Sequence, residues 1–169
     1  MLDAGVALAL MALVLAQSWA RYSPMTRWRV HNAAQPVAQL LERDLRFTQQ
    51  TAISSAGNGS HAELCLRADG YDIYAVAHVA ALGGSTAASG IRIKSVTWGK
   101  DYARGVAITA DRAATHNCAA DATRPAVVYL ASGAPKFHDD AAHSVAVTLR
   151  GQTLHVTIQP RTGTTRVGP

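Results

Sequence analysis

The sequence has few charged residues, few aromatic residues and only two cysteines. Charged residues make up 16% of the chain and aromatic residues 6%, whereas apolar residues make up 49%. An apolar fraction of this size excludes an intrinsically disordered chain. The two cysteines form no CxxC pair, which excludes the common zinc-binding motifs. With 169 residues and no visible repeat, the chain predicts one domain that buries a core of its own.

The sequence also lacks the short motifs of common enzyme classes. It contains no GxSxG, no HExxH and no phosphate-binding glycine loop. The remaining candidates for metal ligands are polar loop residues, namely His116, Cys118, His138, Asp139, Asp140 and His143. Their spacing matches no closed ligand set, so we interpret them as residues of solvated turns. The sequence therefore predicts no enzyme activity, no metal site and no cofactor.

The two cysteines, Cys65 and Cys118, have two interpretations. In an exported protein they would most often form a disulfide. That bond would close a loop of about fifty residues and stabilise the fold by on the order of 3–4 kcal/mol. In a reducing compartment they would be two buried thiols, a common environment for cysteine. The sequence favours the disulfide and leaves the alternative open.

Acidic residues are absent from the C-terminal part of the chain. The whole sequence has a net charge of +5 and a pI of about 9.6, which permits attraction to anionic partners. No Asp or Glu occurs between Ala141 and Pro169, whereas Arg150, Arg161 and Arg166 all fall in this stretch. The last predicted strands therefore carry a net positive field.

An apolar run near the N-terminus extends from Ala4 to Ala16, with Asp3 in front of it. One interpretation is a signal peptide cleaved after Ala20, which would leave a free periplasmic β-domain. A second interpretation is a short membrane span, in which the transmembrane or assembly segment covers about residues 2–23. The two interpretations predict different mature proteins, since only the second retains the apolar run.

A third interpretation continues the apolar run as one long helix over residues 1–56. Apolar residues recur at helical spacing from Val37 to Ala52. The charged residues of this stretch fall largely off the apolar stripe: Glu42, Arg43, Asp44 and Arg46. Glycines at positions 57 and 59 end the helix. We therefore expect residues 1–56 to form an N-terminal helix and residues 57–169 to form a β-rich globular head.

Short alternating segments fill the predicted head. The expected strands are residues 62–67, 71–76, 91–98, 105–109, 126–130, 145–149 and 154–158. Asp69-Gly70 predicts a hairpin turn between the first two of them. Residues 82–90 and 110–124 are expected to be loops. The predicted fold class is α+β, with the long helix packed on one antiparallel sheet or on two.

Four stretches carry a resemblance to a known family: Asp3 before the apolar run, and residues 42–53, 128–135 and 160–167. In these stretches and their order, the chain resembles the GspH/FimT-type minor pseudopilins of the type IV pilin superfamily. The resemblance implies a pilin-like subunit of a type IV pilus or a type II secretion pseudopilus. It implies a single-pass protein of the bacterial inner membrane, with its head in the periplasm, which later assembles with other pilin or pseudopilin subunits.

The resemblance gives Asp3 a role in assembly. The family has a glutamate near its mature start, and Asp3 is the nearest counterpart here. A carboxylate in hydrocarbon needs a partner, and the N-terminal ammonium of a neighbouring copy can supply one in a filament. The alternative is that Asp3 lies at the membrane interface or caps the start of a helix.

The resemblance also suggests DNA as a partner. Some FimT-like minor pilins are DNA receptors that use basic residues of a Gly-Arg-x-Arg pattern near the C-terminus. The counterpart here is Gly163-Thr164-Thr165-Arg166, so only the last arginine is retained, and Arg150 and Arg161 are the other candidates. Phosphate contacts of this kind are strongly salt-dependent. The alternative is a solvated basic edge that prevents sheets from pairing with one another.

Overall fold

The structure is a computed structural model of the chain, and it describes residues 11, 34–55, 60–78, 88–99, 104–111, 116–149 and 151–169. The predicted membrane or assembly segment of about residues 2–23 lies outside the described residues, apart from Met11. Within the part of the chain that is described, we find no helix with the length and hydrophobicity that a membrane span requires.

One helix, residues 34–54, packs on the rest of the described chain. The stretch from Val37 to Ala52, predicted to be amphipathic, is helical throughout. The side chains of its apolar stripe are fully buried: Ala34, Val37, Ala38, Leu41, Leu45 and Ala52. Burial of this stripe is what fixes the helix on the sheets.

The predicted fold class is wrong in its account of the helix. We expected one long helix over residues 1–56, but the helix in the described residues is short and covers residues 34–54. The described part is mostly β, with this one helix packed on two antiparallel sheets. Within the described residues, the helix is stabilised by its contact with the sheets, because the stripe from Ala34 to Ala52 is buried against them.

The nine strands of the described residues form two antiparallel sheets. The five-stranded sheet has the order β3-β2-β1-β6-β5, and the four-stranded sheet has the order β4-β7-β8-β9. The bounds in the first sheet are β1 His61–Arg67, β2 Gly70–His78, β3 Ala88–Thr97, β5 His116–Cys118 and β6 Asp121–Leu130. The bounds in the second sheet are β4 Val106–Ala110, β7 His143–Leu149, β8 Gln152–Ile158 and β9 Thr165–Gly168.

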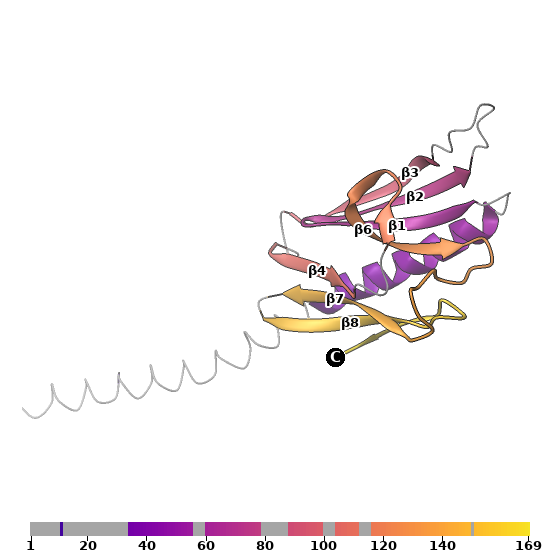
Figure 1. Cartoon of the computed structure of the whole chain (residues 1–169). Helices are drawn as coiled ribbons and strands as arrows, with labels where there is room; N and C mark the ends of the chain where they lie inside the picture. The colour runs from indigo at the N-terminus through magenta and orange to yellow at the C-terminus, as the bar shows by residue number, and fades with distance from the viewer. Residues whose placement is uncertain are drawn as a thin grey trace, which may run out of the picture.

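The core lies where the helix meets the inner faces of both sheets. Figure 1 shows the helix running between the sheet of β1, β2 and β3 and the sheet of β7 and β8. The main apolar cluster takes fully buried side chains from the helix (Leu41), from the five-stranded sheet (Leu64, Val127) and from the four-stranded sheet (Val147, Val156). The helix is therefore a central layer of the fold, because both sheets bury their apolar faces against it.

Two connections differ in how well the sequence predicted them. The hairpin at Asp69-Gly70 joins β1 and β2, as the sequence predicted. A side chain at Gly70 would collide with the carbonyl oxygen of Val96 on β3, so the close approach of β2 and β3 requires glycine at this position. In contrast, residues 110–124 were expected to be a loop, and they contain β5 and the start of β6 instead. The alternation of apolar and polar residues that marks a strand is weak in β5. This strand is held by the disulfide at Cys118 rather than by the burial of one face.

Candidate functional site

The structure places two of the four residues predicted to have binding or assembly roles. Asp3 and Arg150 lie outside the described residues. Arg161 is exposed in the turn between β8 and β9, and Arg166 is exposed on β9, which is the edge strand of the four-stranded sheet. Both arginines thus project from the same terminal segment, as a surface that contacts a polyanion requires.

This terminal segment is fastened to the helix by side chains that the sequence analysis did not single out. Arg46 donates to Oγ1 of Thr165 at 3.0 Å and to its carbonyl oxygen at 3.3 Å. Gln49 Nε2 donates to the carbonyl oxygens of Thr162 at 2.7 Å and of Gly133 at 2.8 Å. These contacts hold the basic C-terminal segment beside the basic outer surface of the helix.

An open groove beside the helix, of about 380 Å³, collects more of these basic residues. Its lining side chains come from the helix and from β3: Arg43, Asp44, Arg46, Phe47, Gln50 and Lys94. Phe47 is 39% exposed there and offers an aromatic surface between the cations. In nucleic-acid-binding proteins, arginines contact the phosphates and an exposed aromatic ring stacks on the bases. The signal in the sequence was the spacing of Arg43, Arg46 and Phe47, which places them on one side of a helix.

The charge of Lys94 in the groove is neutralised within the protein by Asp44. Asp44 is 1% exposed, and its carboxylate accepts from Lys94 Nζ at 2.6 Å and from the Tyr71 hydroxyl at 2.7 Å. Burial and the hydrogen bond to Asp44 raise the pKa of Tyr71. The sequence analysis placed Asp44 largely off the buried stripe, and the structure contradicts that placement. Its carboxylate joins the helix to β2 and β3, so Lys94 has a structural partner. Arg46 is also ion-paired, with Glu42 at 2.7 Å, which leaves Arg43 as the most exposed cation of the groove.

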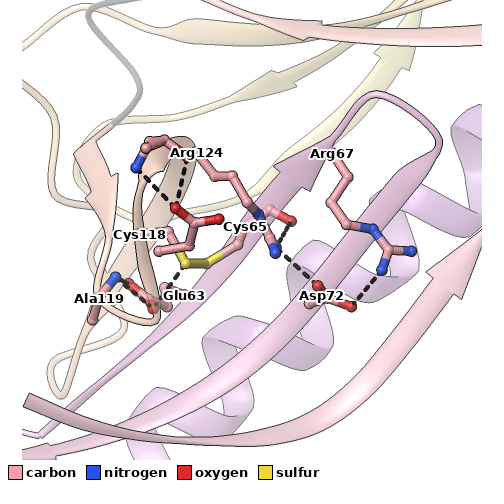
Figure 2. Close-up of a disulfide and its surroundings, with 9 residues drawn as sticks. Glu63, Cys65, Arg67, Asp72, Cys118, Ala119 and Arg124 are labelled. Carbon is pink, nitrogen blue, oxygen red and sulfur yellow. Dashed lines mark hydrogen bonds and ion pairs between the residues drawn. A yellow bond between two sulfur atoms is a disulfide. The ribbon is translucent and has the colours of Figure 1, made fainter.

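Cys65 and Cys118, the pair that the sequence analysis joined, form a disulfide between β1 and β5. Figure 2 shows Glu63 beside this bond, with its carboxylate 3.5 Å from Cys118 Sγ and accepting from the Ala119 backbone N–H at 2.9 Å. Burial raises the pKa of Glu63, although the N–H of Ala119 opposes the shift. Glu63 and the two sulfurs are close enough for a metal ion, but disulfide sulfurs are not the thiolates that bind metals. The arrangement therefore serves to fix β5 on the sheet.

A buried ion cluster continues on the same face of the five-stranded sheet. Asp72 on β2 lies between Arg124 Nη2 at 2.8 Å and Arg67 Nη1 at 3.4 Å (Figure 2). Burial opposes ionisation of Asp72, but its hydrogen bonds and the two arginines outweigh burial and lower its pKa. The cluster ties β1, β2 and β6 together, and its charges are directed at one another instead of at a ligand.

The histidines proposed as candidate metal ligands are divided between two places. His143 is buried at the start of β7, with Nδ1 3.1 Å from an oxygen of Asp111 and Nε2 2.6 Å from an oxygen of Asp139. Burial opposes protonation of this imidazole, but the two carboxylates outweigh burial and raise the pKa of His143. Both ring nitrogens are occupied by carboxylates, so His143 is an ion-paired clamp and offers no free nitrogen to a metal.

His116 lines a hollow of about 520 Å³ at the end of β1 and β6. His116 there contacts the carbonyl oxygen of Lys136 through Nε2 at 2.9 Å, and its ring packs on His138 at 4.4 Å. Burial lowers the pKa of His116, which favours the neutral form of its ring. These contacts hold the connection of residues 131–142 on the sheet. Among the described residues that line the hollow, no nucleophile lies beside a base.

No protein-family model matches the chain, and neither a curated protein nor a solved structure matches it significantly. The resemblance to the minor pseudopilins stays a prediction that rests on the sequence.

Proposed function

We propose that this chain is a minor pilin or pseudopilin subunit, with a structural role in a filament and not an enzymatic one. Its apolar residues 4–16 would sit in the bacterial inner membrane and then pack against other subunits, with Asp3 as the acid that pairs inside the filament. The part from residue 60 onward would face the periplasm. The GspH/FimT resemblance of the sequence supports the proposal.

The observation that carries this proposal is the combination of an apolar run with a disulfide-bonded β part in one chain. Disulfides persist in oxidising compartments such as the periplasm, and Cys65 is joined to Cys118. A chain with such a bond that also keeps an apolar segment of residues 4–16 fits a membrane-anchored, outward-facing subunit better than a cytoplasmic protein. Pilin-like subunits combine these two parts.

Fractionation of bacteria that express the full chain tests the proposal. We expect the chain in the inner-membrane fraction, with its β part digested by protease only after the outer membrane is opened. N-terminal sequencing of the same sample decides the alternative, since a soluble periplasmic protein that begins at Arg21 would identify a cleaved signal peptide and refute the filament role. Asp3→Asn provides the matched variant: it should still enter the membrane but should lose co-assembly with other subunits.

A second candidate function is DNA capture by the same subunit. The observation that favours it is the pair of bonds from Arg46 to Thr165, which place the basic outer surface of the helix beside the terminal segment that carries Arg161 and Arg166. Phosphate contacts would then come from two segments that are distant in the sequence. The partner class is DNA, bound through its backbone and with little sequence preference.

Gel shifts with the full chain in detergent test this second candidate. We expect DNA affinity to fall steeply with salt, and Arg161→Ala/Arg166→Ala to reduce the slope of log K against log salt by about 1.8 on duplex DNA. Arg92→Ala/Arg104→Ala removes the same charge from exposed residues outside the surface and should leave the slope unchanged. If the two double variants change the slope equally, net charge alone explains the interaction with DNA. A separate Arg150→Ala variant tests the remaining predicted arginine.

A further inference from the structure

The two sheets end in four edge strands, which are β3 and β5 of the five-stranded sheet and β4 and β9 of the four-stranded sheet. An edge strand presents unpaired backbone N–H and C=O groups along its free side. Such an edge is a template for another strand unless it is short, bulged, charged or covered. A comparison of the four edges therefore shows where this protein is open to strand pairing.

Three of the four edges carry protective features. In β3, the register with β2 shifts at a bulge, and Arg92 adds an exposed charge between Ile91 and Ile93, which are exposed as well. β5 has three residues, and its Cys118 is fixed by the disulfide. β9 has four residues, carries Arg166 and ends just before the C-terminal Pro169. Each of these edges is a poor template for a partner strand.

The edge strand β4 has none of these features. Its five residues, Val-Ala-Ile-Thr-Ala, contain no charge and no proline, and its register with β7 is uninterrupted from Val106 to Ala110. Ala107 and Thr109 are exposed on the outer face of the sheet. On the inner face, Ile108 and Ala110 are only partly buried where they pack on the core. Within the described residues, β4 is thus a regular strand whose free side leaves apolar surface incompletely covered.

We propose that β4 is the contact surface for a second copy of this chain, whose own β4 pairs with it in the antiparallel direction about Ile108. This register places Ile108 opposite Ile108 and Val106 opposite Ala110 on the inner face. On the outer face it places Ala107 opposite Thr109. Side chains on the same face then meet across the pair, as antiparallel strands require. The two four-stranded sheets become one continuous sheet of two copies.

The charges that flank β4 favour a second copy over an unrelated strand. Arg104 precedes the strand and is exposed. Asp111 follows the strand and is 51% exposed, although one of its carboxylate oxygens already contacts His143 Nδ1 within its own chain. In an antiparallel pair, the start of one β4 lies at the end of the other. Arg104 of each copy therefore comes close to Asp111 of the partner at both ends of the pair, while the uncharged centre brings no like charges together. The contact concerns the sheets alone and does not depend on the filament role or on DNA.

Sedimentation of the full chain in detergent, over a range of protein concentrations, tests this contact. We expect a weak, concentration-dependent dimer. Ala107→Lys/Thr109→Lys places two pairs of lysines opposite each other across the dimer and should weaken it on the order of tenfold. Ala107→Lys/Thr109→Glu alters the same exposed positions but sets a lysine opposite a glutamate, so dimerisation should return to the wild-type level or exceed it.

A control variant and a cross-link complete the test. Thr153→Lys/Thr164→Lys adds the same two charges at exposed positions away from β4 and should dimerise like the wild type. Ala107→Cys/Thr109→Cys should give a covalent dimer on mild oxidation, because the two positions face each other across the pair. A monomer at every concentration would overturn the proposal. Equal association of all variants, failure of the lysine–glutamate variant to recover, or a weakened control would overturn it as well.

Discussion

Removal of the Asp44 carboxylate should destabilise the protein more than removal of the partly exposed carboxylate of Glu42 on the same helix. In Asp44→Ala, the buried hydroxyl of Tyr71 loses its 2.7 Å partner, which costs about 1–3 kcal/mol. Lys94 also loses its 2.6 Å contact, but its side chain is 33% exposed and can turn to water, so this loss adds at most about 1 kcal/mol. Together these terms predict a decrease of about 1–4 kcal/mol in the free energy of unfolding.

Urea unfolding of the full chain, with the disulfide intact, measures this decrease from the midpoint and slope. Glu42→Ala is the matched control, because Glu42 is ion-paired to the largely exposed Arg46 on the same helix, and its loss should cost about 0.5 kcal/mol or less. A double-mutant cycle of Asp44→Ala with Tyr71→Phe should show strong coupling. If Asp44→Ala costs no more than Glu42→Ala, the carboxylate does not hold the helix on the sheet.

Three further predictions concern other parts of the fold. Cys65→Ser/Cys118→Ser should lower the free energy of unfolding by about 4 kcal/mol, which urea unfolding measures against the oxidised protein. The pKa of His143 is raised above 6.5 in the folded protein. The stabilising effect of the protonated His143 is therefore complete below pH 6.5 and is lost as the pH rises through the raised value. His143→Gln should remove this pH dependence from the midpoints of urea unfolding. Gly163 has a φ of +66°, and a Cβ there would lie 2.9 Å from the carbonyl oxygen of Gly133. In urea unfolding, Gly163→Ala should therefore lower the free energy of unfolding by about 1–2 kcal/mol from backbone strain alone, and by more because of this clash. Gly99→Ala, at an exposed glycine without such a φ or clash, should change it little.

Those parts of the fold that were predictable from the sequence are the ones in which one face of an element is buried. Residues 143–149 alternate between buried and half-buried positions along β7, which is the period that marks a strand in the sequence. The helical spacing of apolar residues from Val37 to Ala52 predicted the helix in the same way. In both cases a local pattern records burial against a core, so it can be recognised without knowing the partner.

The elements that were missed depend on contacts between distant residues. β5 is held by a disulfide to a residue 53 positions away, and three residues are too few to show a period. Asp44 was placed on the polar side because it is charged, yet its position is decided by Tyr71 and Lys94 on other strands. A buried charge is stable only when such partners are present. Helical spacing does place Asp44 on the buried stripe, three residues after Leu41 and seven after Val37. Local sequence contains no record of the partners that make this burial stable, so they could not be predicted.

The same reasoning decides how the basic surface can be tested. Arg46 lies 119 residues from Thr165 in the sequence and is bonded to it in the fold, so its side chain has a structural partner as well as an exposed charge. A substitution at Arg46 would loosen the terminal segment and remove a cation at once, and a loss of DNA affinity would then have two causes. Arg161 and Arg166 are exposed on that segment. Their replacement changes the charge and leaves the bonds of Arg46 in place, so a change in salt slope there reports on phosphate contacts.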